Sequence, residues 1–208
     1  MKLYDYVLSG NCHKVRLLLK FLDLTCDLEP VDFFPGREHK SPVFLQINPL
    51  GQLPVLEDGD LRLRDAQAIL VYLAHKYDAS GQWYPMNDPE ALGRVAQWLA
   101  FAENITATSS AARLHDVLGY NLDVDAARAD AHTLFRVLED HLAHQEFNGQ
   151  HWLAGPLPTI ADIACFPYTA LAGDGGIDTF IYPAIERWLH HFSRLRGFYN
   201  MPGMNYFA

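Results

Sequence analysis

The sequence predicts an α/β amino-terminal region followed by an all-helical carboxy-terminal region. Over residues 1–78, short β-type runs alternate with amphipathic helical stretches in the order β-α-β-α-β-β-α. Beyond residue 90, the apolar residues follow a helical spacing. Residues 78–90 (DASGQWYPMNDPE) are rich in turn formers and are typical of a linker. We therefore expect domains at 1–78 and 90–208, joined by a linker at 79–89.

The first three elements follow from local patterns. Residues 2–8 (KLYDYVL) predict a strand. Residues 15–22 carry apolar side chains at i, i+3, i+4 and i+7, the spacing of one helix face. Residues 27–33 (DLEPVDF) predict a second strand, although Pro30 weakens it because proline cannot donate to a sheet ladder.

The next elements carry clear start and turn signals. Ser41 followed by Pro42 is typical of a helix N-cap, and it predicts a short helix ending near residue 47. Residues 54–57 and 61–63 flank the turn 58–60 (DGD), which predicts a hairpin. Asp65 is expected to cap a further helix, and three apolar stripes predict helices in the second region: 92–99, 134–142 and 185–192.

Composition and charge limit the partners and the compartment. Half of the 208 residues are apolar, and the net charge is −9 with no cluster of lysine or arginine. Nucleic acid and anionic membranes bind clustered cations, so neither is expected as the main partner. No apolar run reaches about 18 residues, and the opening MKLYDYVLSG is too polar for a signal peptide. Three cysteines without a CxxC motif favour the reducing cytoplasm.

Pro54 and Asp65 stand in positions that suit a peptide-like ligand. A cis bond before Pro54 would present nearby backbone groups to an extended peptide, whereas a trans turn proline is the alternative. Asp65 opens a helix whose N–H groups, at Ala66 and Gln67, could receive a carboxylate. The Asp65 side chain would then face an ammonium group, and such a pair fits the amino-acid end of a ligand.

Together these motifs resemble the soluble glutathione S-transferase family over essentially the whole chain. The most specific piece is residues 48–74 (NPLGQLPVLEDGDLRLRDAQAILVYLA), which is similar to the family's glutathione-site signature. Residues 155–168 (GPLPTIADIACFPY) resemble its folding motif, in which Thr159 and Asp162 stand as N-cap and N3 residues and contribute stability. The resemblance implies a thioredoxin-like domain with a mixed four-stranded sheet, an all-helical domain and a cytoplasmic homodimer.

Residue by residue, the resemblance implies a glutathione site. Pro54 would be cis, and Val55 would pair its backbone with the cysteinyl part of glutathione. Asp65 replaces the usual glutamate that contacts the γ-glutamyl ammonium. Ala66 replaces the usual serine, which removes one hydrogen bond to the γ-glutamyl carboxylate but keeps the backbone N–H.

Three further residues complete the expected glutathione site. Gln52 is a candidate for the dipeptide backbone of the ligand, and Leu53 is a further expected glutathione-binding residue. Lys40 is a candidate for the glycine carboxylate, and a solvated surface lysine is the equally weighted alternative.

Ser9 and Asn11 are the candidates for activating the glutathione thiol. Lowering a thiol pKa of about 8.5 by two units requires roughly 2.7 kcal/mol of preference for the thiolate. Ser9 lies between the first strand and the first helix, where a hydroxyl and a helix amino terminus can both face the sulfur. A serine holds this place in the serine-type classes. SGNCHKV also resembles the TPNGHKI-type loop of a bacterial, nu-like class with disulfide-reductase activity, in which Asn11 contacts the thiol.

Neighbouring reactive side chains are expected to be structural. Cys12 could form a mixed disulfide, as in the cysteine-type classes, but those classes place the cysteine nearer position 9 or 10. We expect Cys12 to be an ordinary residue of the first helical turn, with His13 exposed beside it. Tyr4 and Tyr6 alternate onto one face of the strand, where core packing is expected.

The electrophile is expected to bind between the two domains. The carboxy-terminal tail, residues 197–207 (GFYNMPGMNYF), is apolar and predicts a segment folded back over the molecule. The ten histidines form no HExxH motif and no Cys/His cluster with ligand spacing, so no metal is expected. The candidate residues of the pocket are Phe101, Asn104, Thr108 and Arg113, with Tyr168 and the tail.

Three functions follow from these observations. The first is a glutathione transferase that activates the thiol for attack on a small hydrophobic electrophile. The second is a glutathione-dependent disulfide-bond reductase on the same fold. The third is a non-catalytic binding protein that kept the fold, which Ala66 favours.

Overall fold

The computed structural model describes residues 1–202 and Met204. In this part of the chain, the strands β1 (Lys2–Asp5), β2 (Asp27–Pro30), β3 (Val55–Asp58) and β4 (Leu61–Arg64) form one four-stranded sheet in the order β2-β1-β3-β4. β1 and β2 are parallel, and the other pairs are antiparallel. The mixed sheet predicted from the sequence is thus confirmed.

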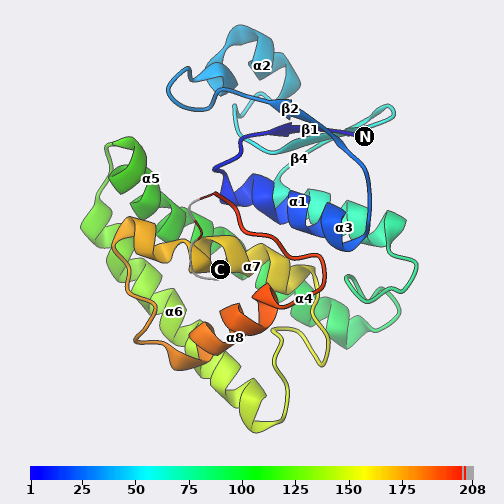
Figure 1. The fold of residues 1–208 in the computed structure, drawn as a ribbon, viewed down its shortest axis with the longest axis vertical. Coiled ribbons are helices and arrows are strands. Elements are labelled where there is room, and N and C mark those ends of the chain that lie inside the picture. The colour runs from blue at the N-terminus through cyan, green and yellow to red at the C-terminus, as the bar shows by residue number, and fades with distance from the viewer. Residues whose placement is uncertain (203, 205–208) are drawn as a thin grey trace.

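Helices cover both faces of the sheet (Figure 1). α1 (Gly10–Phe21) and α3 (Ala66–Tyr77) lie on one face, where Leu3 and Leu56 join the main core. A short 3-10 helix, η1 (Glu38–Lys40), leads into α2 (Pro42–Ile47) on the other face, where Phe44 packs with Tyr4 and Val55.

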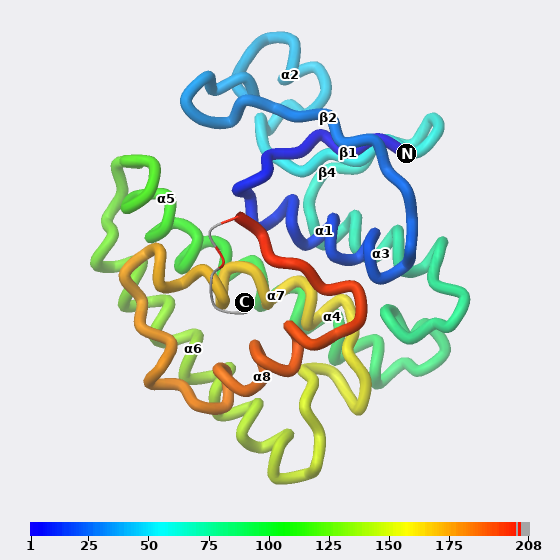
Figure 2. The backbone as a smooth tube through the Cα atoms, in the orientation of Figure 1, coloured from blue at the N-terminus to red at the C-terminus, as the bar shows by residue number. Residues whose placement is uncertain are grey.

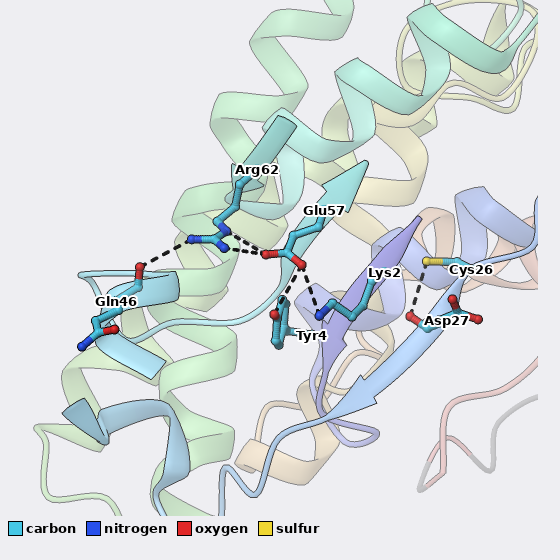
Figure 3. Close-up of polar contacts among 7 residues, drawn as sticks. All are labelled: Lys2, Tyr4, Cys26, Asp27, Gln46, Glu57 and Arg62. Atoms are coloured by element: carbon cyan, nitrogen blue, oxygen red, sulfur yellow. Dashed lines mark hydrogen bonds and ion pairs between the residues drawn. The ribbon is translucent and has the colours of Figure 1, made fainter. Parts of the chain in front are cut away.

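A row of charged side chains crosses the sheet on the face that carries α2. Lys2, Glu57 and Arg62 occupy paired positions on β1, β3 and β4. Figure 3 shows the Glu57 carboxylate between the other two, 3.2 Å from Lys2 Nζ and 2.7 Å from Arg62 Nη2. Arg62 also donates to the carbonyl oxygen of Gln46 at 3.5 Å, which links the hairpin to α2.

The first two strands end earlier than the sequence pattern indicated. β1 ends at Asp5 because the chain turns at once, with the N–H of Ser9 donating to the carbonyl of Tyr6 at 2.9 Å. β2 ends at Pro30, although the N–H of Val31 still donates to the carbonyl of Asp5 at 2.8 Å. The predicted range of residues 2–8 was therefore too long by three residues.

The second half of the described chain is helical, as expected. A π-helical segment and then α5 follow α4 directly. The longest helix of the described chain is α6. The helix α7 contacts α4, α1 and α3. A 3-10 turn, η3, separates α7 from α8. No helix among the described residues is long and apolar enough to cross a membrane. The bounds are α4 Pro89–Ile105, η2 Thr106–Ser110, α5 Ala111–Leu118, α6 Val124–Phe147, α7 Ile160–Ala170, η3 Ala172–Gly175 and α8 Pro183–Ser193.

Thr159 and Asp162 form the expected capping box at the start of α7. The buried Asp162 carboxylate accepts hydrogen bonds from the backbone N–H groups of Leu153 and Thr159 and from Nε1–H of Trp188, at 2.9–3.1 Å. Burial raises the pKa of Asp162 to about 6. One carboxylate thus joins α7, α8 and the loop after α6.

The chain after α8 folds back over the helices (Figure 2). Phe198 packs against Phe166 and Phe192, and the ring of Tyr199 meets that of His13 on α1 at 5.2 Å. The described part of the tail is therefore folded back, as the sequence predicted, and residues 203 and 205–207 of that stretch lie outside the described residues.

Candidate active site

A cavity of about 330 Å³ lies between the amino-terminal end of α1 and the helices α4 and α5. The wall that the first 78 residues contribute includes the loop after β1, the loop before β3 and the start of α3. The described residues that line it are Tyr6, Leu8, Ser9, Asn11, Phe33, His39, Lys40, Gly51, Gln52, Leu53, Asp65, Glu103, Thr106, Ser110, Ala111, Arg113, Leu114, Val117, Leu118, Tyr120 and Tyr168.

Ser9 is the N-cap of α1 and faces this cavity. Its backbone is extended, and its Oγ accepts a hydrogen bond from the N–H of Cys12 at 3.2 Å. An N-cap serine satisfies one of the free N–H groups of a helix with its oxygen, so its own hydroxyl proton stays available for another acceptor. The helix amino terminus adds a partial positive charge at the same place. Ser9 is therefore placed to stabilise an anion in the cavity.

Two arginines hold the loop that carries Ser9. Arg16 on α1 forms an ion pair with Asp5 and donates to the carbonyl of Val7 at 3.0 Å. Arg113 on α5 donates to the carbonyl of Leu8 at 3.2 Å. Because these bonds come from two different helices, α1 and α5, they fix the backbone just before Ser9.

Asn11 also lines the cavity, and its amide is not fully used. Its Oδ1 is buried and has no hydrogen-bond partner among the described residues. A buried amide oxygen without a partner is uncommon in proteins, so this position can accept a hydrogen bond from a ligand. The backbone N–H of Asn11 donates to the hydroxyl of Tyr168 at 3.3 Å.

Cys12 and His13 are both buried beneath this turn. Burial raises the pKa of Cys12 to about 12, so its thiol stays protonated. The expectation of an exposed His13 is wrong, because the tail and the helical domain cover α1 on the side away from the sheet. Burial lowers the pKa of His13 to about 3 and keeps the imidazole neutral.

The loop before β3 contains the cis Leu53–Pro54 peptide bond that the resemblance implied. Gln52 and Leu53 line the cavity. The prediction for Val55 is wrong, because Val55 already lies in the sheet between Tyr4 of β1 and Arg64 of β4. A bound peptide therefore has no free strand edge at Val55, and the residues of this loop that line the cavity are Gly51, Gln52 and Leu53.

Asp65 is the N-cap of α3 and lines the cavity. It has a positive φ of 79°, and its Oδ1 accepts from the N–H of Ala68 at 2.9 Å. A non-glycine residue in this backbone region carries strain that the surrounding structure must offset. The Ala66 side chain is buried. Gln67 turns to the carboxylate of Glu103 on α4, so it joins the two sides of the cavity.

Lys40 reaches the cavity from η1. Its Nζ donates to the carbonyl oxygens of Leu50 and Gly51, at 3.1 and 2.9 Å. The lysine is thus held over the loop before β3, with its charge at the cavity rim.

On the helical side, Arg113 is the one predicted pocket residue of the four that lines the cavity. Its guanidinium is engaged by Asp174 at 2.9 Å as well as by the Leu8 carbonyl. Phe101 packs against Trp98, and Thr108 Oγ1 donates to the carbonyl of Asn104. Phe101, Asn104 and Thr108 are not among the described residues that line the cavity; from the same stretch Glu103, Thr106 and Ser110 line it instead.

Several lining residues were missed by sequence reasoning. Tyr6, expected in the core, stacks on Phe33 at 5.3 Å, and Phe33 stacks on His39 at 4.1 Å. The contact of Tyr6 with Phe33 joins separate segments of the sequence, so no local pattern points to it. In contrast, Leu114, Val117 and Leu118 follow the helical spacing i, i+3, i+4, a signal that was available. No group of acidic, histidine or cysteine side chains that could hold a metal occurs in the described part of the chain.

Comparisons with known proteins agree with this architecture. A family model described as "Glutathione S-transferase, N-terminal domain" matches residues 3–81, and one described as "Glutathione S-transferase, C-terminal domain" matches residues 123–200. Glutathione S-transferase theta-1 of Rattus norvegicus is 31% identical over 198 residues, which cover 90% of this chain and 80% of that protein.

Solved structures give the same result. A glutathione S-transferase from Pseudomonas fluorescens superposes with a TM-score of 0.86 at 29% identity, over 96% of this chain and 98% of that one. A glutathione transferase homolog from Lodderomyces elongisporus, described with two GSH per subunit, has a TM-score of 0.80 at 26% identity, over 94% of each chain. From the two domain matches and the identity to the rat protein, the chain belongs to the glutathione S-transferase family of enzymes.

Proposed function

We propose that this protein is a glutathione transferase that activates the glutathione thiol with Ser9 for attack on a small apolar electrophile. The observation that carries the proposal is the Ser9 hydroxyl at the amino terminus of α1, facing a cavity with Asp65 on the same wall. Asp65 can face the γ-glutamyl ammonium, and the N–H groups at the start of α3 can receive the adjacent carboxylate. Like other members of the family, the protein is proposed to act as a cytoplasmic homodimer.

The chemistry uses the groups already described. The bound thiol loses its proton to solvent, and the Ser9 hydroxyl donates a hydrogen bond to the resulting thiolate. The sulfur then forms a bond to the electrophilic carbon, whose leaving group departs with its electron pair. The apolar residues Leu114, Val117 and Leu118 of α5 provide a wall for that electrophile. Asn11 contributes a second polar contact near the sulfur.

Glutathione-dependent disulfide reduction is the second candidate function. The unpaired Oδ1 of Asn11 favours it, because this residue matches the asparagine of the nu-like loop. In either reaction the attacking sulfur belongs to glutathione. The raised pKa and the burial of Cys12 argue against a mixed disulfide with the protein.

Glutathione titration by calorimetry and two activity assays test these proposals. A transferase binds glutathione at millimolar concentration or below and conjugates chlorodinitrobenzene, whereas a reductase mainly turns over hydroxyethyl disulfide. Absence of binding at millimolar glutathione would refute both activities and favour a non-catalytic protein with the same fold.

Variants separate the roles within the first turn of α1. Ser9→Ala is expected to lower turnover at least about tenfold, because a hydrogen bond to a charged group contributes roughly 1.5–3 kcal/mol. Cys12→Ala should change turnover little. Ser193→Ala, at a partly exposed serine at the end of α8, is the matched control. An inactive Cys12→Ala enzyme with an active Ser9→Ala enzyme would reverse the assignment.

A further inference from the structure

Tyr168 connects the helical domain to the first turn of α1. It lies on α7, its side chain is 6% exposed, and it lines the cavity. Its hydroxyl accepts a hydrogen bond from the backbone N–H of Asn11 at 3.3 Å. A side chain of the second domain therefore meets the backbone that carries the thiol-activating residues.

The approach of the Tyr168 ring depends on Gly10. A Cβ atom at position 10 would lie 2.6 Å from Cε1 of Tyr168, closer than real Cβ contacts allow. Because Gly10 has no side chain, the ring can lie directly against the start of the helix. The contact therefore depends on both residues, the glycine on α1 and the tyrosine on α7.

The Tyr168 side chain is held as a neutral phenol. Burial raises the pKa of Tyr168, while its contacts with Ser110, with the backbone of Asn11 and with Ser9 act in the opposite direction. The neutral hydroxyl accepts from the Asn11 N–H. The ammonium of Lys14 lies 5.3 Å from the ring centroid, a cation–π distance that also holds the ring in place.

We propose that Tyr168 is a positioning residue for thiol activation, which fixes the first turn of α1 through its hydroxyl at the Asn11 N–H and its ring against Gly10. The N–H of Cys12 in the same turn donates to Ser9 Oγ at 3.2 Å, so the position of this turn sets where the Ser9 hydroxyl lies. Because the Ser9 oxygen accepts from Cys12, its own proton is left for the cavity, where the glutathione sulfur would lie. Tyr168 thus acts through Ser9, and the inference rests on the proposed transferase function.

Tyr168→Phe removes the hydroxyl and leaves the ring in place. The thiolate absorbance of bound glutathione, titrated between pH 5.5 and 9.5, gives the pKa of the bound thiol directly. We expect this pKa to rise by about one unit in the variant, and kcat/KM below pH 7 to fall about tenfold. The two pH profiles should converge at high pH, and KM for glutathione should stay unchanged, because the glutathione contacts are intact.

Tyr182→Phe is the matched control. Tyr182 is a buried tyrosine whose hydroxyl contacts Nδ1 of His132 at 2.9 Å, away from the cavity. Loss of the Tyr182 hydroxyl should lower the stability of the protein and leave the pH profile of the thiol unchanged. This control separates a structural effect from a positioning effect.

Gly10→Ala tests the same contact from the α1 side. The added Cβ would push the Tyr168 ring away, so we expect the same upward shift of the thiol pKa with the hydroxyl still present. This variant also carries the test if Tyr168→Phe does not fold. Bound glutathione with an unchanged thiol pKa in both variants would overturn the role of Tyr168 alone. A wild-type protein that binds no glutathione would overturn the proposed function and this inference with it.

Discussion

Lys14 is a lysine buried at the junction of α1, α7 and the π-helical segment. Its side chain is fully buried, and its Nζ contacts Thr106 Oγ1 at 3.5 Å and the ring of Tyr168. Burial lowers the pKa of Lys14 to about 8, although Cys165, Glu103 and Asp65 act to raise it. We predict that Lys14→Met makes the protein more stable at pH 7.

The size of the effect follows from the pKa of Lys14 in the folded and unfolded states. The pKa falls from 10.5 to about 8 on folding. At about 1.4 kcal/mol per unit, holding the charged form in the folded state at pH 7 costs about 3 kcal/mol. Methionine keeps most of the buried stem, and the lost hydrogen bond to Thr106 offsets about 1 kcal/mol of the gain. The variant is therefore expected to gain about 2 kcal/mol of unfolding free energy.

The gain must depend on pH in a defined direction. Between pH 8 and 10.5 the folded state binds fewer protons at Lys14 than the unfolded state, so wild-type stability rises with pH across this window. The advantage of Lys14→Met should therefore shrink over the same window and reverse slightly once the lysine is neutral in both states.

Urea unfolding at pH 7, 8.5, 9.5 and 10, at one fixed protein concentration, measures this difference. Comparing variant with wild type at each pH removes the contribution of other titrating groups. Lys20→Met, on the exposed face of the same helix, is the control and should change stability by no more than about 0.5 kcal/mol at any pH. A Lys14→Met protein that is less stable at pH 7, with a difference that does not vary with pH, would refute the reasoning.

Two further predictions concern a buried carboxylate and the cysteines. Asp162→Ala should cost about 3–5 kcal/mol in urea unfolding, because three N–H donors lose their buried acceptor. Asp123→Ala, at the exposed cap of α6, should cost only about 1 kcal/mol, and equal losses would contradict this account. At pH 8, iodoacetamide should label the half-buried Cys26 before Cys12 and Cys165, whose pKa values burial raises strongly; mass spectrometry of the labelled sites checks the order.

The sequence determined those parts of the fold that depend on neighbouring residues. The caps at Ser41, Asp65 and Thr159 are where the sequence placed them, because a cap needs only a polar side chain and the next turn of helix. The hairpin at residues 58–60 follows equally from its turn chemistry. Helix and strand order, and with them the fold class, were therefore predictable from periodicity.

The outlines of the candidate site were also partly predictable. Ser9 is found as a helix cap beside a cavity, which its place between strand and helix indicated. The prediction for Val55 failed because only the sheet pairing shows that β1 and β4 already lie on either side of this residue. The prediction for Phe101 failed because its ring packs against Trp98 in the helical core, and helical periodicity does not show whether an apolar face meets the core or the cavity.

What only the tertiary structure decided is the meeting of the two domains around α1. Local sequence predicts an exposed first turn at His13, yet the helical domain and the returning tail bury it. The contact of Tyr168 with Gly10 and Asn11 joins residues more than 150 positions apart. Periodicity reports which face of an element is apolar, but it does not report which distant element covers that face. For this reason the sequence alone identified the cap that faces the cavity, and only the folded chain showed what holds that cap in place.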